Sequence, residues 1–236
     1  MERKSWRKKF QLVKATWRAY RPKEKVEYWR VSPLDFGVAF SRSLTSDVEM
    51  TSDVSGWQIE DSEWSFRVRV AVLDRRVAKL RSEVVTTFDT SDLTTFDFDV
   101  LAAALAIEGR ELEPSPLVRP SSTDDEVRLL VKEFSDRIDR IWTFAHGFTI
   151  EGLETLSIWA IRNRNFVGIP KGPPAYAIGV ICTAFIYGEQ ELFRELLREY
   201  EMHLEKRRRS EVFSEETRAI HATLSEQVTK LRSLLS

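Results

Sequence analysis

The chain is poor in the residues that most often build a catalytic or metal centre. It contains one cysteine, three histidines, nine glycines and eight prolines in 236 residues. The single Cys182 can form neither an internal disulfide nor a Cys-x-x-Cys metal site, and its apolar surroundings in IGVICTAF predict a buried core residue. The histidines at 146, 203 and 221 match no short metal-binding spacing. We therefore expect no cofactor and no metal ion.

The usual catalytic motifs are missing as well. The glycines are too scattered to form a phosphate-binding loop, and no G-x-S-x-G nucleophile motif occurs. Paired carboxylates occur at Asp97/Asp99 and Asp124/Asp125, but each pair stands directly before an apolar helical pattern. Acidic side chains there cap a helix and complement its dipole, which favours a structural role. One enzymatic alternative stays open, a site assembled from distant residues under the Gly/Pro-rich loop at 166–174.

No apolar run is long enough for a membrane span. The longest, Ala175–Tyr187, has thirteen residues, and a helix needs roughly 20 to cross a bilayer. The basic N-terminus is not followed by the apolar core of a secretory signal. We therefore expect a cytoplasmic protein that does not enter the membrane.

The N-terminal part of the chain has the two-residue period of half-buried β-strands. Apolar and polar residues alternate over 26–31, 34–44 and 64–73, which predicts antiparallel strands with one polar face. Between them, the acidic stretch 45–62 predicts only one short strand, GWQIE, with the remainder as loop. Residues 5–20 carry aromatic residues at helical spacing, with Ser5 as N-cap and Pro22 as the stop, although a strand through 10–20 is an alternative.

The C-terminal part has the period of helices. Residues 114–122 contain three prolines and predict a linker, and a capping box at Thr123 and Glu126 predicts the start of the next helix. Gly147 is the expected left-handed end of that helix, and Gly188 separates an apolar helix from an amphipathic one within 173–204. Ser214 is the expected cap of the last helix.

This order of elements predicts an α+β fold. We expect an N-terminal antiparallel β-meander with a flanking helix, followed by a C-terminal all-helical half packed on the sheet. The prediction is one composite domain over 1–236, with a mainly sheet half at 1–113, a helical half at 123–236 and the linker at 114–122.

A net charge of −1 conceals strong local asymmetry. Residues 1–30 hold eleven Lys or Arg and three acids, a balance of +8. Residues 45–65 hold six acids and no base, and residues 83–113 hold eight acids and one base. Basic residues among aromatics at the N-terminus could grip nucleic acid, but on a helix the aromatics fall on one face as core and the charges on the other as solvated surface, so this interpretation is not favoured. The strand arginines 30, 42, 67 and 69 could hold an anion, but cross-strand pairing with acids is the favoured interpretation.

Two helical stretches resemble a known kind of protein. RIWTFAHGFTIEGLETL (Arg140–Leu156) is a helix that ends in aromatics, followed by a turn and a new helix start. YAIGVICTAFIYGEQELFRELLREY (Tyr176–Tyr200) is an apolar helix, a Gly-Glu turn and an L-x-x-L-L helix. After a β-meander, they resemble α+β domains of unknown function encoded near bacterial polymorphic toxins, which are regarded as candidate immunity proteins.

The resemblance implies a non-catalytic protein that captures a toxin. Because many such toxins are nucleases with basic clefts, the acidic segments are the expected docking surface. An exposed aromatic would supply an anchor. The candidate partner-binding residues are Asp47, Glu49, Asp53, Trp57, Glu60, Asp61, Asp89, Asp92 and Asp97. One alternative is the enzyme described above. The other is a helical adaptor or regulatory protein that forms a homodimer through the heptad-like stretch 215–235.

Overall fold

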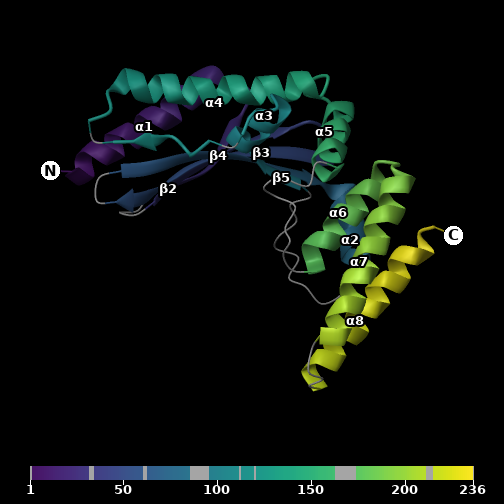
Figure 1. The fold of residues 1–236 in the computed structure, drawn as a ribbon. Coiled ribbons are helices and arrows are strands. Elements are labelled where there is room, and N and C mark those ends of the chain that lie inside the picture. Colours follow the sequence, from purple (N-terminus) through teal and green to yellow (C-terminus); the bar gives the residue numbers. More distant parts are fainter. Residues whose placement is uncertain are drawn as a thin grey trace. The chain divides into compact units, whose positions relative to one another are not determined.

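The computed structural model describes residues 2–31, 35–60, 63–85, 96–111, 113–119, 121–162, 174–210 and 215–235 (Figure 1). It confirms the α+β fold: an N-terminal antiparallel sheet with a flanking helix is followed by a mostly helical C-terminal half. In chain order the elements are α1 (Glu2–Tyr20), β1 (Lys25–Val31), β2 (Asp35–Ser43), β3 (Val48–Glu60), β4 (Glu63–Asp74), α2 (Arg75–Val84), β5 (Phe96–Asp99), α3 (Val100–Ile107), β6 (Leu117–Val118), α4 (Asp124–Phe144), α5 (Ile150–Arg162), α6 (Pro174–Ile186), α7 (Gln190–Ser210) and α8 (Glu215–Ser233).

The contacts within the chain divide it into two compact units. Unit 1 comprises 1–73 and 96–168, and unit 2 comprises 74–95 and 169–236. Helix α2 therefore belongs to unit 2, although it lies between two strands of the sheet in sequence. The division does not fall at 114–122, and α4 and α5 pack with the sheet in unit 1. The prediction of one composite domain stays a prediction.

The sheet of unit 1 is antiparallel, in the order β1-β2-β3-β4-β5, and β6 pairs β4 beside β5. Strands β2 and β3 pair from Asp35 opposite Trp57 to Ser43 opposite Glu49. Since side chains alternate across a strand, this register sets one apolar face and one polar face. The apolar face of the sheet is buried, as the alternation along 34–44 and 64–73 predicts.

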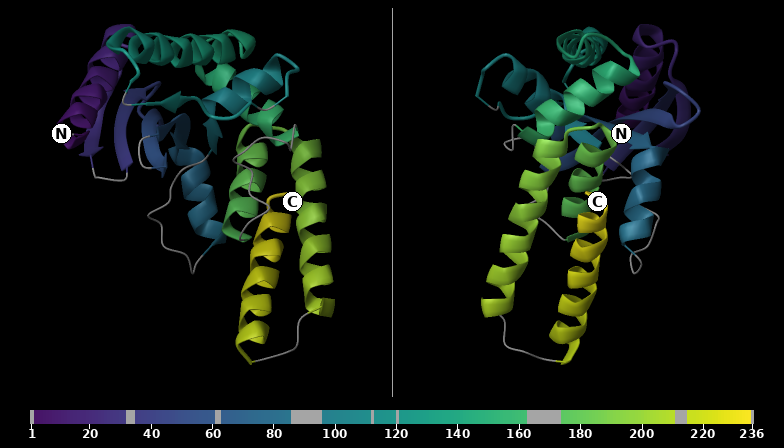
Figure 2. Two further views of the ribbon diagram at one scale, coloured as in Figure 1. Left: turned by 60° about the vertical axis from the view of Figure 1, so that its left-hand side comes forward. Right: turned by 90° about the vertical axis from the view of Figure 1, so that its right-hand side faces the viewer.

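Helices α1 and α4 cover the apolar face (Figures 1 and 2). The ring of Phe10 in α1 stacks on Phe36 of β2, with ring centroids 4.0 Å apart. Further along α1, Trp17 stacks on Phe40 at 5.7 Å. From α4, Phe134 meets Phe66 of β4 edge-on at 5.2 Å. The helix expected over 5–20 is thus confirmed and the strand alternative is wrong, because its aromatics fill the core above the sheet.

The loop expected over most of 45–62 is wrong, because β3 is a strand of 13 residues. Its core-facing positions include Val48, Met50 and Val54, but also Ser52 and Gly56, all of them buried. These two small residues hide the two-residue period from a hydrophobicity pattern. Gly56 is needed there, since a Cβ on it would lie 2.3 Å from Cε1 of Phe36.

The linker expected at 114–122 takes part in the sheet. Strand β6 pairs with β4 through Val118 opposite Trp64, and Val118 is buried. The prolines do not prevent this, because Pro116 uses its carbonyl, which accepts a hydrogen bond from the amide of Phe66 at 2.9 Å. A run rich in proline was therefore wrongly predicted as a pure linker.

Helix boundaries follow local chemistry closely in α4. The capping box is present: the side chain of Thr123 accepts from the amide of Glu126, and that of Glu126 accepts from the amide of Thr123. At the other end, the expected Gly147 has a positive φ of 118°, and His146 before it also does, with φ of 64°. The helix ends in a Schellman motif. The amide of Gly147 donates a hydrogen bond to the carbonyl of Trp142 at 2.7 Å, and the amide of His146 donates one to the carbonyl of Thr143 at 3.1 Å. Helix α1 begins at Glu2, so Ser5 is not its N-cap.

Among the described residues, unit 2 contains the helices α2, α6, α7 and α8, and the expected helical pair within 173–204 is confirmed as α6 and α7. Gly188, with φ of 76°, separates them. Helices α7 and α8 run antiparallel and side by side (Figure 2), joined by Arg232 to Glu201 at 2.8 Å and by Arg208 to Ser225 at 2.8 Å. The expected cap at 214 lies outside the described residues.

Gly152→Ala tests the corner between α4 and α5. A Cβ at position 152 would lie 2.0 Å from the carbonyl oxygen of Gly147 and 2.9 Å from that of Ala145. Because backbone cannot yield as a flexible side chain does, we expect the variant to lose about 3 kcal/mol of unfolding free energy, measured by urea denaturation.

Gly179→Ala is the matched control, also within a helix. Its Cβ would meet Arg81 at 3.7 Å, which is ordinary contact. Alanine favours a helix over glycine, so this variant should be about 0.5 to 1 kcal/mol more stable. Equal destabilisation of both variants would contradict the assigned corner.

Candidate functional site

The polar face of the sheet, opposite α1 and α4, is the first candidate site. In β3 it presents Glu49, Thr51, Asp53 and Ser55, all half-buried. The paired positions in β2 are small: Ser43, Ser41, Ala39 and Gly37 stand opposite them. A row of carboxylates and hydroxyls on β3 thus lies beside a row of short side chains on β2. Such a surface can make hydrogen bonds and ion pairs with a docked partner, and within it the hydroxyl of Ser41 donates a hydrogen bond to the carboxylate of Glu27 in β1.

The structure brings three of the nine predicted site residues together. Glu49 and Asp53 lie on the same face of β3, and Asp47 lies exposed in the turn before it. The turn is fixed locally, because the hydroxyl of Thr45 accepts hydrogen bonds from the amides of Asp47 at 3.2 Å and Val48 at 3.1 Å. We call Asp47, Glu49 and Asp53 the acidic hairpin patch.

The other six predicted residues cannot be joined to this patch. Trp57 and Glu60 belong to β3, and Asp97 belongs to β5 opposite Ala71, but only their backbone is described. Asp61, Asp89 and Asp92 lie outside the described residues. Their place in a docking surface stays a prediction.

The polar face is not uniformly acidic. Arg67 and Arg69 of β4 also lie on it, half-buried and exposed. The Nε of Arg67 contacts Oδ2 of Asp99 at 2.6 Å, while Oδ1 of Asp99 accepts from the amide of Ala102 and caps α3. For Arg67 the predicted cross-strand ion pair is confirmed. Asp99 is thus engaged inside the fold, whereas Glu49 and Asp53 lie at the β2–β3 end of the face.

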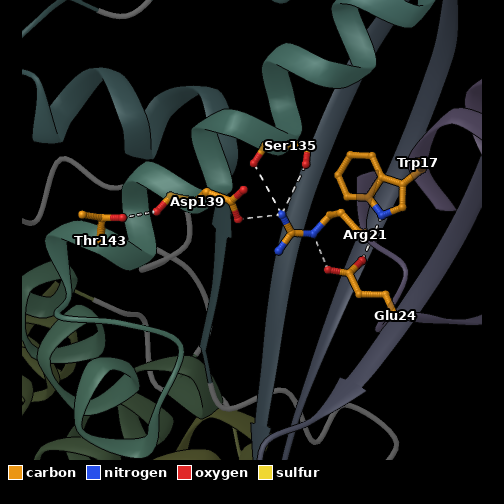
Figure 3. A network of polar contacts seen from close by, with 6 residues as sticks. All are labelled: Trp17, Arg21, Glu24, Ser135, Asp139 and Thr143. Atoms are coloured by element: carbon orange, nitrogen blue, oxygen red, sulfur yellow. Dashed lines mark hydrogen bonds and ion pairs between the residues drawn. The ribbon is translucent and has the colours of Figure 1, made fainter. Parts of the chain in front are cut away.

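A second candidate is a buried polar network where α1 ends (Figure 3). Glu24 accepts a hydrogen bond from the indole Nε1 of Trp17 at 2.9 Å and pairs with Nε of Arg21. The side chains of Arg21 and Glu24 are only 8% and 1% exposed. From α4, Asp139 contacts Arg21 at 3.0 Å, and the hydroxyl and carbonyl of Ser135 lie 3.4 Å from the same nitrogen.

This network is a structural tie rather than a reaction centre. The charges of Arg21 and Glu24 neutralise each other, and the other hydrogen-bond partners in the network are also side chains or backbone of this protein. The network joins segments separated by up to 118 residues. Sequence reasoning missed it, although Trp17, Arg21 and Glu24 stand one helical turn apart and Ser135 and Asp139 share one face of α4. That spacing on two separate segments was the available signal.

Cysteine and histidine residues are the remaining candidates for a reactive site. Among the described residues, no group of three or more His, Cys, Asp or Glu side chains could hold a metal ion. Cys182 is fully buried, as predicted, and burial raises the pKa of its thiol to about 12 despite the opposing effect of Arg81. His146 and His203 are exposed. The loop 166–174, proposed above as an active-site lid, lies outside the described residues except for Pro174.

Comparison with known proteins adds no assignment. No family model, curated protein or solved structure matches the chain. Among the helices in the described ranges, none is long and apolar enough to span a bilayer. The case for function therefore depends on the surfaces of the molecule itself.

Glu24→Gln tests the buried network. The change keeps the shape of the side chain but removes its charge, so the buried guanidinium of Arg21 loses its closest counter-ion. We expect a loss of about 3 kcal/mol in urea denaturation. Asp139→Asn is the control, because the side chain of Asp139 is 69% exposed; it should cost less than about 1 kcal/mol. The reverse order of the two effects would refute the structural role.

Labelling with a thiol reagent at neutral pH tests the state of Cys182. A buried thiol whose pKa is about 12 carries almost no thiolate, so modification requires opening of unit 2. Ser43→Cys, made in a Cys182→Ser background, places a thiol at an exposed position. We expect it to react at least about 100-fold faster than native Cys182. Comparable rates would show that Cys182 is accessible.

Proposed function

We propose that the protein is a non-catalytic binding protein of the immunity kind, which captures a basic toxin domain through the acidic hairpin patch. The observation that carries the proposal is the arrangement of Glu49 and Asp53 on the polar face of β3, with Asp47 exposed at the adjoining turn. Six residues of extended chain span about 20 Å, which is the size of a docking surface rather than of a pocket.

The electrostatics of the patch suit capture of a basic partner. Carboxylates of one sign attract a basic cleft over the distance of a Debye length and raise the rate of encounter. They are held on a strand whose other face is in the core, so little side-chain or backbone ordering is needed on binding. The predicted aromatic anchor, Trp57, belongs to the same strand and would supply the buried contact that charge alone rarely provides.

The apolar stripes of the helices support this choice over the adaptor alternative. In α8, Leu224 and Leu231 are 3% and 0% exposed in a single chain. These leucines, on which dimerisation through 215–235 would depend, are thus already buried within a single chain. In the described part of unit 1, helices α1 and α4 cover the opposite, apolar face of the sheet.

The test is co-expression with a toxin domain encoded by the neighbouring reading frame, followed by binding kinetics on the purified pair. Asp47→Asn, Glu49→Gln and Asp53→Asn together remove three negative charges at nearly constant shape. We expect association to slow by about 10-fold or more at low salt, with a weaker salt dependence, and growth protection to fall accordingly.

The matched control removes three exposed carboxylates elsewhere: Glu83→Gln, Glu111→Gln and Asp124→Asn. It should leave the association rate within about twofold of the unmodified protein, because these positions lie outside the patch. Absence of binding to the toxin domain, or equal slowing by both triple variants, would contradict the proposal.

A further inference from the structure

The outer side of helices α1 and α4 exposes a group of apolar side chains. Tyr20 of α1 and Leu129 of α4 are 44% and 66% exposed, and Leu129 is the most exposed large apolar side chain in the part of the chain that the structure describes. Ala15 and Ala19 of α1 are exposed as well, and Leu12 is half-buried. We call these five residues the α1–α4 strip. A single exposed leucine is ordinary, but a group of exposed apolar residues on neighbouring helices marks an interaction surface.

Contacts at both ends hold the two helices next to each other (Figure 1). Lys9 of α1 donates a hydrogen bond to the carbonyl of Ser122, just before α4 begins, and Arg21 contacts Asp139 further along α4. Leu129 lies about midway between these two contacts along α4, so it is level with the middle of α1. The apolar residues of both helices therefore belong to one surface.

The geometry of α1 sets the length of this surface. Leu12 and Tyr20 follow Lys9 at i+3 and i+11, so they lie on the side of α1 that faces α4. Ala15 and Ala19 lie beside them, toward solvent, where their methyl groups leave room for another helix to approach closely. From Leu12 to Tyr20 the strip extends about 12 Å at 1.5 Å per residue, which matches apolar residues at i, i+3 or i+4, and i+7 of a docked helix.

The charge that α1 contributes beside the strip is positive. The helix contains seven Lys or Arg and a single acid, Glu2. Two of these bases, Lys8 and Arg18, are exposed within one helical turn of Leu12 and of Ala15. One margin of the strip is therefore basic.

The charges that α4 contributes beside the strip balance each other. Arg128 pairs with Asp125 at 2.7 Å, and Lys132 pairs with Asp136 at 2.7 Å. These pairs leave the positive charge of α1 as the excess around the apolar residues. Such a surface is complementary to a partner of negative charge.

We infer that the α1–α4 strip binds an acidic amphipathic helix of a partner protein. Protein interfaces combine an apolar centre with a polar margin, and tyrosine is one of the residues that most often anchor them. A second copy of this chain docked through the same strip would bring the bases of two α1 helices together, which is unfavourable. The strip and the acidic hairpin patch lie on opposite sides of the sheet, so this inference goes beyond the proposed function and does not depend on it.

The experiment is fluorescence anisotropy of the full chain with a labelled peptide of three Leu-Glu-Glu-Leu-Ala-Glu-Lys repeats. The leucines of this peptide lie on one face of a helix, and its net charge is negative. Because the strip is shorter than a standard interface, we expect a dissociation constant on the order of 10 μM at low salt. A peptide of the same composition in scrambled order should bind at least about 10-fold more weakly, because its leucines do not form one row.

Two double variants separate the apolar contribution from the charge. Tyr20→Gln with Leu129→Gln removes the two large exposed side chains and should weaken binding of the ordered peptide by at least about 10-fold. Lys8→Gln with Arg18→Gln should weaken it by about threefold or more at low salt and by less at high salt. All four side chains are exposed, so circular dichroism melting should show that both variants fold as the unmodified protein does.

The matched control is Met202→Gln with Leu235→Gln, which removes two apolar side chains of unit 2 that are 59% and 43% exposed. It should bind the ordered peptide within about twofold of the unmodified protein. Equal weakening by this control and by the Tyr20/Leu129 variant would overturn the inference. Equal binding of the ordered and scrambled peptides, or no binding at about 100 μM peptide, would also overturn it.

A DNA duplex and phosphatidylserine vesicles are the remaining arms. If either displaces the ordered peptide and binds more tightly, the partner is a nucleic acid or a lipid surface, and the inference is wrong. The Asp47/Glu49/Asp53 variant should bind the peptide as the unmodified protein does, which separates this result from that of the proposed function.

Discussion

The buried ion pair between Arg21 and Glu24 is the constraint on which the arrangement of unit 1 depends. A charge taken out of water is costly unless it is paired and hydrogen-bonded, and here Trp17, Ser135 and Asp139 supply the remaining contacts. These groups come from α1, the turn between α1 and β1, and α4. The network can be satisfied only when all three meet, so it fixes how α1 and α4 lie on the sheet.

That fixed arrangement separates the charges of unit 1. With its apolar stripe held in the core, α1 presents Arg7, Lys8 and Arg18 to solvent. The same helices cover the apolar face of the sheet. Glu49 and Asp53 lie on the polar face, on the opposite side of the strands. In the described part of unit 1, exposed bases thus lie on α1 and carboxylates lie at the β2–β3 end of the polar face.

Features that depend on a few neighbouring residues could be predicted from the sequence. The capping box at Thr123 and Glu126, the break at Gly188 and the burial of Cys182 each depend on a few neighbouring residues, and the structure confirms them. Strand β3 was missed because Ser52 and Gly56 occupy core-facing positions, where volume matters more than hydrophobicity. The Arg21 network and the pairing of β6 depend on segments far apart in sequence, and no single-sequence pattern encodes which segments meet. The same reason explains the assignment of α2 to unit 2. Of the predicted site, the cluster of Asp47, Glu49 and Asp53 could be predicted by counting charges along the sequence. The presence of Arg67 and Arg69 on the same face of the sheet could not, because it depends on the order of the strands.

The central claim is that function lies on a docking face of the sheet rather than in an interior site. Hydrogen exchange of the chain, followed residue by residue with and without the basic toxin domain, measures it most directly. We expect slowed exchange at the β2–β3 end, around residues 43–55, with little change in α4 or in the helices of unit 2. Protection confined to α6–α8, with none in the β2–β3 hairpin, would contradict it.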